Sequence, residues 1–311
     1  MALSFDRIRP MTLVPAALIV VAGIASFVLQ TQVFVSDATE ADWKAASDYI
    51  LDHKKPDDGI RVHPAWTEEP YPYLTEARLD FSRQDAPVAE DLVDFQRLWL
   101  MVEEDRRDEA IRVLPWEVGE EVESKSFGAV DVLLIPRPDS PTYTYELLTH
   151  LEDAEIRRIR KGKPVINCKR WNAKKRHWYC ERPDPWIYVG ETIRSMDNDP
   201  RRCIWAHPPP NYYWVELTYD DVPMGDVFRV RAGPTANAVR SKRGTEIELE
   251  VEIDGRTQSH TFPPRSQAWR AIDVDTSKWA GQTKKVQVRV RSPKVFDRFF
   301  CLNGWSIEQP K

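Results

Sequence analysis

The sequence predicts α/β plus all-β architecture behind an apolar N-terminal segment: a small three-layer α/β domain, then an antiparallel β-sandwich. Helical and strand-like patterns alternate up to residue 136, whereas two-residue alternation dominates from residue 186 onward. The charge divides in the same way. Residues 36–156 hold 30 acidic and 12 basic side chains, a net of −18, and residues 157–311 hold 18 and 30, a net of +12. We therefore expect two units with different surfaces, and the sequence leaves open whether these oppositely charged units dock on each other.

The N-terminal segment predicts a membrane anchor. Between Arg9 and Asp37 there are 27 residues without a formal charge, and about 20 apolar residues suffice to span a bilayer as a helix. Arg7 and Arg9 precede this run and acidic residues follow it, which favours a cytoplasmic N-terminus. We expect residues 1–36 to be a cytoplasmic stub and a single transmembrane anchor. A signal peptide cleaved near Ala25 is the alternative, and both interpretations export the rest of the chain.

The four cysteines all lie in the exported part, where an even number predicts disulfides. Of the three possible pairings we favour Cys168–Cys180, which closes a short loop, and Cys203–Cys301, which joins the ends of the C-terminal domain. The sequence has no C-x-x-C and only six scattered histidines, so we expect no metal site. It also lacks the glycine-rich phosphate-binding motifs, and we expect no cofactor.

Residues 37–136 form the predicted acidic α/β domain. Apolar spacing predicts a helix over 41–51, a short strand over 60–64 and a helix over 103–114. The nearly continuous apolar run 95–102 is typical of a strand covered on both faces. Later strands are expected over 120–125 and 130–135.

Four short motifs in this domain occur in a recognisable order: Asp42-Trp43-Lys44-Ala45-Ala46, Pro56-Asp57-Asp58, Arg97-Leu98-Trp99-Leu100-Met101 and Phe127-Gly128-Ala129-Val130. About 100 residues here resemble the extracytoplasmic α/β domain of bacterial polyprenyl-phosphate-sugar glycosyltransferases, the relatives of O-mannosyltransferases and aminoarabinose transferase. Those enzymes carry their catalytic acid between many membrane helices, which this chain lacks. The resemblance therefore implies an accessory protein of cell-surface glycan metabolism at the bacterial inner membrane, with its bulk in the periplasm, and transfers no catalytic residue.

The loop after the first predicted strand holds the densest reactive side chains of this domain. His63, Trp66, Glu68 and Glu69 follow the strand, where α/β domains place ligand crevices. They could supply an acid and a base or bind a polar ligand. The alternative is a proline-rich loop with solvated glutamates.

Residues 137–163 are expected to be a proline-rich linker followed by a helix over 143–160. The segment between Cys168 and Cys180 then interleaves aromatic residues with Lys169, Arg170, Lys174, Lys175 and Arg176. This pattern is typical of a polyanion-binding patch. Export argues against nucleic acid and favours acidic polysaccharide or lipid headgroups, the alternative being a solvated hairpin.

Residues 164–311 form the predicted disulfide-tied sandwich. Period-two alternation over 213–219, 246–253 and 285–291 predicts half-buried antiparallel strands, and Asp254-Gly255 predicts a hairpin turn. The order of Cys203-Ile204-Trp205, Ala268-Trp269-Arg270 and Phe299-Phe300-Cys301 resembles galactose-binding-like jelly rolls. Because sugar-binding modules use exposed aromatic rings as platforms, the resemblance makes six residues candidates for binding saccharide, with core packing as the alternative: Trp205, His207, Tyr212, Tyr213, Trp214 and Trp269.

The sequence thus favours a non-catalytic, membrane-anchored periplasmic protein of cell-envelope glycan assembly or recognition, whose sandwich binds saccharide or a partner protein. A second hypothesis is a structural subunit of an envelope complex, bound to a polytopic membrane protein and without a sugar site. The third is a hydrolase or transferase that uses the His63–Glu69 loop.

Overall fold

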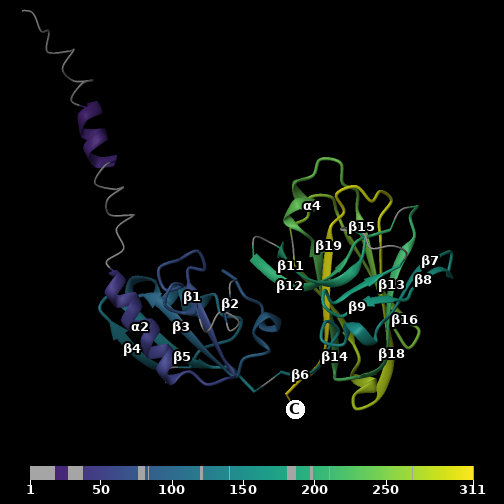
Figure 1. Ribbon diagram of the computed structural model, residues 1–311, viewed down its shortest axis with the longest axis horizontal. Coiled ribbons are helices and arrows are strands. Elements are labelled where there is room, and N and C mark those ends of the chain that lie inside the picture. The colour runs from purple at the N-terminus through teal and green to yellow at the C-terminus, as the bar shows by residue number, and fades with distance from the viewer. Residues whose placement is uncertain are drawn as a thin grey trace, which may run out of the picture.

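The computed structural model describes residues 18–26, 38–75, 81–82, 84–119, 122–139, 141–180, 187–196, 199–209, 211–267 and 269–310. These residues form an α/β domain and a β-sandwich, which lie side by side along the long axis of the molecule (Figure 1). The chain passes from the first unit to the second shortly before β6 (Thr142–Glu146).

The α/β domain is built on a five-stranded sheet in the order β2-β1-β3-β5-β4. β1 is parallel to β2 and β3, whereas β5 is antiparallel to β3 and β4. Helix α2 begins with a capping box between Thr39 and Asp42 and buries Trp43 and Ile50 against one face of the sheet. A second apolar cluster with Ala110 of α3 covers the other face, so the predicted three layers are present. The elements are α2 (Glu40–His53), β1 (Asp58–His63), β2 (Phe81–Ser82), η2 (Ala89–Leu92), β3 (Arg97–Glu103), η3 (Glu104–Arg106), α3 (Arg107–Arg112), β4 (Glu123–Phe127) and β5 (Val130–Pro136).

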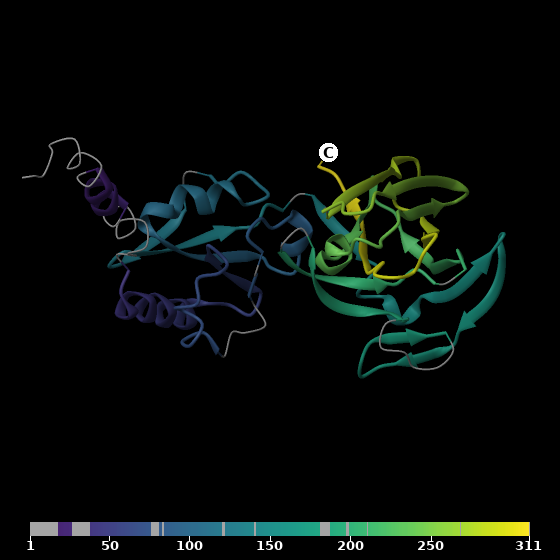
Figure 2. The ribbon, with the colours of Figure 1, turned by 90° about the horizontal axis from the view of Figure 1, so that it is seen from above.

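The sandwich stacks an eight-stranded sheet, in the order β17-β14-β19-β12-β11-β10-β9 with β6 beside β19, on a six-stranded sheet in the order β16-β15-β18-β13-β7-β8. The hairpin β7–β8 extends from the side of the sandwich that faces away from the α/β domain (Figure 2). The remaining elements are η4 (Leu151–Asp153), β7 (Glu155–Arg160), β8 (Lys163–Cys168), β9 (Arg170–Asn172), β10 (His177–Tyr179), β11 (Val189–Met196), β12 (Asp199–Ala206), β13 (Trp214–Pro223), β14 (Val227–Pro234), α4 (Ala236–Arg240), β15 (Ile247–Ile253), β16 (Arg256–Phe262), β17 (Arg270–Asp275), η5 (Ser277–Trp279), β18 (Thr283–Arg291) and β19 (Phe300–Glu308).

The core of the sandwich follows from the alternation in the sequence. In β15 the residues Ile247, Leu249, Val251 and Ile253 are buried, and the glutamates between them face outward. Because successive side chains of a strand point to opposite faces, each sheet gives one apolar face to the shared core. Both expected disulfides, Cys168–Cys180 and Cys203–Cys301, are present.

The helix expected over 143–160 is wrong. That range contains β6, a turn with η4, and β7, so the sandwich begins at Thr142 and the range 137–163 is not a linker and helix. β6 pairs with β19, and β7 pairs with β13 and β8. The apolar residues Leu147, Leu148 and Leu151, whose spacing indicated a helix, fill the sandwich core from the turn. Tertiary hydrogen-bond partners decided the structure over local spacing.

Most of the expected membrane anchor lies outside the described residues. Within it, residues 18–26 are described and are helical, with exposed Leu18, Ile19 and Ile24. In the part of the chain that the structure describes, none of the helices has the length and apolar character needed to cross a bilayer.

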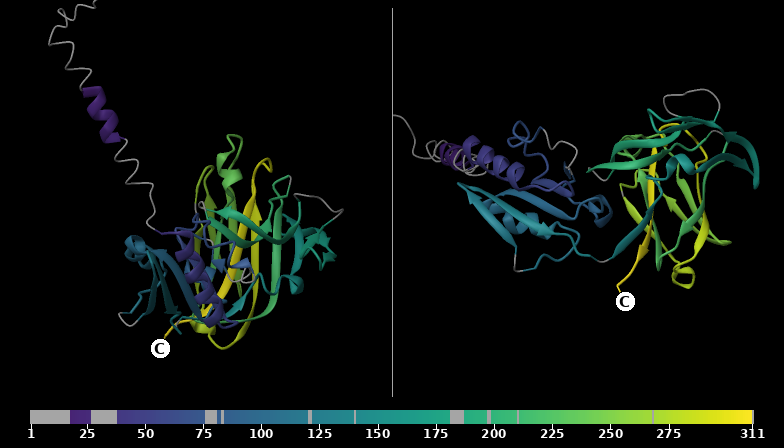
Figure 3. Two further views of the ribbon diagram at one scale, coloured as in Figure 1. Left: turned by 60° about the vertical axis from the view of Figure 1, so that its left-hand side comes forward. Right: turned by 60° about the horizontal axis from the view of Figure 1, so that its bottom comes forward.

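The two units contact each other through residues 84–92, which we call the docking loop. Its backbone is fixed on the α/β side by Arg61, which donates to the carbonyl oxygens of Gln84 and, at 2.7 Å, of Asp85. Burial is the main cause that lowers the pKa of Arg61, to about 10, against the raising effect of nearby aspartates. On the sandwich side, Asp199 accepts a hydrogen bond from the backbone N–H of Asp85 at 2.6 Å. The right-hand view of Figure 3 shows the α/β domain and the sandwich next to each other.

Charged side chains complete the contact between the units. Glu90 of the docking loop is buried and lies 2.8 Å from Arg229 and 2.6 Å from Arg231, both of β14. Asp91 is paired with Arg201 of β12, which also lies 3.1 Å from Asp199. Acidic residues of the first unit thus meet basic residues of the second.

Candidate functional site

The outward face of the six-stranded sheet carries a ladder of charged and polar side chains. Register places Glu250 of β15, Arg289 of β18, Glu216 of β13 and Arg157 of β7 in one row across four strands. Cross-strand neighbours on one face lie close enough to interact. This row combines carboxylate acceptors with guanidinium donors over the middle of the sheet.

Arg289 is held in place by its carboxylate neighbours. Its Nε lies 2.7 Å from Glu216, its Nη1 lies 2.7 Å from Glu252, and its Nη2 donates to the side-chain oxygen of Gln287 at 3.2 Å. Burial acts against the charge of Arg289, but the bonds to Glu216 and Glu252 outweigh it and raise its pKa. The guanidinium is therefore a permanently charged group in a fixed orientation.

Aromatic residues gather at one end of the ladder. The guanidinium of Arg291 lies 4.1 Å from the ring centre of Trp214 and 4.2 Å from that of Tyr212. Tyr212 donates its hydroxyl hydrogen to Glu248, and this bond raises the pKa of Tyr212. Tyr213 lies against Arg160, 5.4 Å from its guanidinium carbon. Three of the six aromatic and histidine candidates thus lie together beside this face.

A hollow of about 300 Å³ lies on the outward face of this sheet, over residues of β15, β18, β13 and the β7–β8 hairpin. Its volume is at the small end of the range for small-molecule sites. It is lined by Arg157, Ile159, Gly162, Pro164, Trp214, Glu216, Glu250, Gln287 and Arg289.

The other three candidates are not surface platforms. Trp205 is 1% exposed, Trp269 is 7% exposed and His207 is also buried. Trp205 lies under Arg194 and stacks at 5.3 Å on Phe299, in an apolar cluster that Val88 of the docking loop covers. The docking loop of the α/β domain packs against this part of the eight-stranded sheet. Aromatic side chains on its outward face are therefore buried in an apolar cluster.

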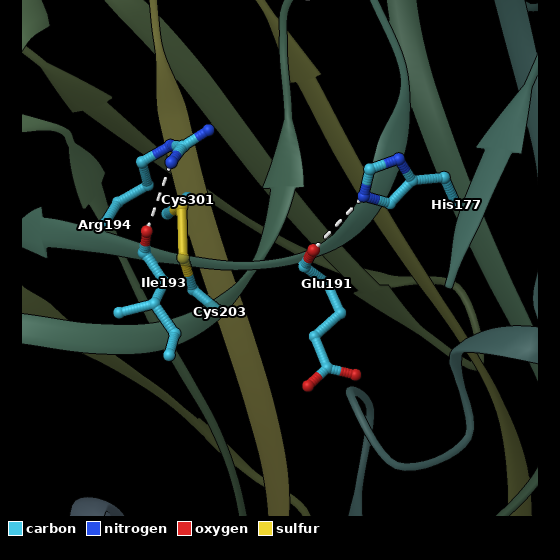
Figure 4. Close-up of a disulfide and its surroundings, with 6 residues drawn as sticks. All are labelled: His177, Glu191, Ile193, Arg194, Cys203 and Cys301. Carbon is cyan, nitrogen blue, oxygen red and sulfur yellow. Dashed lines mark hydrogen bonds between the residues drawn. A yellow bond between two sulfur atoms is a disulfide. The ribbon is translucent and has the colours of Figure 1, made fainter. Parts of the chain in front are cut away.

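The disulfide between β12 and β19 belongs to the same cluster. Figure 4 shows Cys203 and Cys301 joined beside Arg194, which donates to the carbonyl oxygen of Ile193 at 3.3 Å. Nearby, His177 donates from Nε2 to the carbonyl oxygen of Glu191 at 3.3 Å. Burial is the largest cause that lowers the pKa of His177. These contacts brace β10, β11 and β12, and they leave no ring face open there.

The predicted basic patch is only partly available. Lys169, Arg170, Lys174 and Lys175 are exposed on β9 and the turn that follows it. Arg176 instead forms an ion pair with Glu191 and donates to the carbonyl oxygen of Leu148 at 3.1 Å. The patch therefore consists of the first four residues.

The His63 loop does not bring an acid and a base together. His63 is buried at the end of β1, and its carboxylate neighbour is Glu109 of α3 at 3.8 Å. Burial and then the charge of Arg61 lower the pKa of His63. Glu68 and Glu69 are exposed to solvent, and Trp66 is exposed beside them.

Sequence reasoning missed most of the residues that line the hollow. The strands were predicted, and the four side chains that sequence reasoning missed stand at their outward positions: Glu216, Glu250, Gln287 and Arg289. Acidic residues recur at the outward positions of β15 and basic residues at those of β18. This complementary pattern was a usable signal that the two strands pair. The missing information was the order of the strands, which alone brings the four side chains into contact.

No protein-family model matches this chain, and no curated protein matches it. Among solved structures, CBM51 from Clostridium perfringens GH95 in complex with methyl-galactose is 11% identical, with a TM-score of 0.27, 37% of this chain covered and 79% of that one. CBM51-2 and INT domains from Clostridium perfringens ZmpB are 14% identical, with a TM-score of 0.31 and coverages of 60% and 41%. TmCBM61 in complex with beta-1,4-galactotriose is 14% identical, with a TM-score of 0.24 and coverages of 53% and 96%. Similarities of this size carry no functional information.

Proposed function

We propose that this protein binds saccharide without catalysis, through the hollow on the six-stranded sheet. The observation that carries the proposal is the lining: planar amide, carboxylate and guanidinium groups that neighbouring side chains hold rigid, beside the largely buried indole of Trp214. Planar bidentate groups match the paired hydroxyls of a sugar ring, and an aromatic surface matches its apolar C–H face. Preorganised groups lose little entropy on binding.

The cellular setting is proposed together with the site. We infer that residues 10–36 anchor the chain in the bacterial inner membrane, with the sandwich in the periplasm and a role in envelope glycan assembly or recognition. The uncharged run and the positive charges before it support this orientation. The resemblance of the α/β domain to that of polyprenyl-phosphate-sugar glycosyltransferases supports the glycan setting. A sandwich that binds no saccharide and co-purifies with a polytopic membrane protein would instead favour the structural-subunit hypothesis.

The binding test uses affinity electrophoresis of the detergent-solubilised chain through neutral and acidic polysaccharides. Gln287→Ala and Trp214→Ala should each weaken retardation at least about tenfold in Kd, which corresponds to 1.4 kcal/mol. The matched control is Gln258→Ala, since Gln258 is an exposed glutamine on the edge strand β16, outside the hollow. Equal binding by Gln287→Ala, Trp214→Ala and Gln258→Ala would contradict the proposal.

The basic edge of the sandwich is a second candidate, for acidic polysaccharide. Between Arg157 and Cys180 the chain holds ten Lys and Arg residues and no Asp or Glu, and Lys169, Lys174 and Lys175 are exposed. Edge lysines also protect a sheet from pairing with other chains. Retardation that disappears at high salt and in Lys174→Glu with Lys175→Glu would identify this edge as the site.

A further inference from the structure

One end of the sandwich is formed by residues 207–209, 211–213, 235–246, 263–267, 269 and 292–299, which we call the loop end. Strand directions bring these connections together, since each follows a strand that runs toward the same end. Figure 1 shows this end at the top, around α4. These segments hold six Lys and Arg residues against two Asp and Glu residues. The loop end is therefore basic.

Phe296 stands at the loop end and is 67% exposed. Pro293 and Lys294 precede it and are exposed as well, and the exposed Lys242 and Arg243 lie in the segment after α4. An aromatic ring that faces water loses the free energy that burial would provide. Here it stands among cations.

The loop that carries Phe296 is braced from below. Arg298 is fully buried and donates to the carbonyl oxygens of Thr245 at 2.7 Å and Ala238 at 2.8 Å. Asp297 accepts a hydrogen bond from Ser241 at 2.8 Å. Two loops are thus locked together with the ring of Phe296 pointing out, so its exposure is a fixed feature of the fold.

We propose that the loop end is a contact surface for an anionic lipid bilayer. Phe296 enters the headgroup region, while Lys242 and Lys294 meet lipid phosphates and Arg243, which is paired with Asp297 at 3.0 Å, lies beside them. An apolar ring accompanied by basic side chains is the combination that interfacial membrane binding uses. A hydrophilic polyanion would match the cations but would leave the ring in water.

The position of the loop end fits the anchoring proposed above, on which this inference rests. In Figure 1 the N-terminus of α2 and the loop end point toward the same side of the molecule. The residues before α2 lead back to the apolar segment. A protein anchored by that segment would hold the loop end toward the same membrane.

The test places an environment-sensitive fluorophore on the full chain, reconstituted in vesicles of neutral or mixed anionic lipid. The label is carried by Phe296→Cys, and the matched control is Ile193→Cys, because Ile193 is 64% exposed on β11. In anionic vesicles only, the emission maximum of the label at position 296 should shift to the blue, and spin-labelled lipid should quench its fluorescence several-fold. Equal responses at the two positions, or a label at position 296 that stays in water, would overturn the proposal.

Charge-reversal variants test whether the lysines of the loop end, and not lysines elsewhere in the protein, bind the anionic lipid. Lys242→Glu with Lys294→Glu should abolish the blue shift, and high salt should reduce it. The control pair Lys174→Glu with Lys175→Glu on the β9–β10 turn should retain it. An unchanged shift in the first pair would contradict the role of the cations. In detergent, the double variant Lys242→Glu with Lys294→Glu should be retarded by polysaccharide as strongly as the unmodified chain. The lipid assay and the saccharide assay therefore test the two proposals separately.

Discussion

Glu90 shows at the scale of one residue how the two units are joined. Its side chain is fully buried and its two carboxylate oxygens contact different arginines, Arg229 and Arg231. Arg229 also lies 2.7 Å from Asp273 at the surface. The bonds to Asp273 and Glu90 raise the pKa of Arg229 against the opposing effect of burial. A buried charge is tolerated here because every charge has a partner.

Glu90→Gln should destabilise the protein by about 3–5 kcal/mol, because it leaves two guanidinium groups without their buried counterion. The control Asp273→Asn removes a carboxylate that is 46% exposed from the same arginine and should cost less than about 1 kcal/mol. Urea unfolding followed by tryptophan fluorescence measures both. Similar losses in the two variants would contradict the importance of the buried contact.

The aromatic candidates show what residue patterns can and cannot predict. Tyr212 is exposed and Trp214 lines the hollow although it is only 9% exposed, whereas Trp205 and Trp269 are buried in a separate apolar cluster. Alternation indicates which side chains share a face of a strand. Alternation does not indicate which face of a sheet other parts of the protein cover. Such covering is the reason that Trp205 and Trp269 are buried.

At the scale of elements, the strands were predictable where alternation was strict. The ranges expected around residues 213–219, 246–253 and 285–291 correspond to β13, β15 and β18. The range 143–160 was not predictable in the same way, because its leucines lie in a turn and its strands depend on β13 and β19 for partners. Local spacing contains no information about a partner more than 50 residues away.

Asp58 joins two elements of the α/β sheet. It begins β1, and its carboxylate accepts hydrogen bonds from Arg97 at 2.6 and 2.8 Å and from Trp99 at 2.9 Å, both of β3. Burial acts to raise the pKa of Asp58, but these bonds outweigh it, so the pKa lies below its ordinary 3.8. The bonds thus stabilise the protein above that pH, and the contribution is lost as the pH falls through the folded-state pKa.

Asp58→Asn should therefore lower the free energy of unfolding at pH 7 by about 1.5–3 kcal/mol, the usual range for hydrogen bonds to a charged group. The loss should shrink as the pH falls below 3.8, because the unfolded chain then takes up a proton that the folded protein binds only at its lower pKa. Urea unfolding at pH 7 and in steps down to about pH 2 measures the difference. A loss that is the same at every pH would show that the charge of Asp58 contributes nothing.

At the scale of the whole molecule, the net charges of −18 over residues 36–156 and +12 over residues 157–311 left open whether the two units dock, and the docking loop shows that acidic side chains of the first unit contact arginines of the second. The location was not predictable. Glu90 and Asp91 are two of 26 acidic residues between positions 36 and 141, and only the folded loop places them against β12 and β14. Net charge predicts attraction but not geometry.

The folded molecule should also lose stability as the pH falls below 6.5. Burial is the first cause that lowers the pKa of His63, His177 and His260 from their ordinary 6.5. The unfolded chain then takes up protons at a higher pH than the folded chain, so the free energy of unfolding decreases as the pH falls from 6.5 toward the folded-state values. Asp91 acts in the opposite direction, because burial raises its pKa against the effect of Arg201.

The contribution of a single histidine can be isolated at His63, which is buried and whose carboxylate neighbour is 3.8 Å away. His63→Leu should flatten the dependence of the unfolding free energy on pH between 6.5 and 5, by at most about 1.4 kcal/mol per pH unit. Urea unfolding at half-unit steps from pH 5 to pH 8 measures both slopes. The variant removes the protonation of His63 but leaves Asp91, His177 and His260 in place, so their effects cancel in the difference. If the two slopes coincide, burial of His63 does not make the fold sensitive to acid.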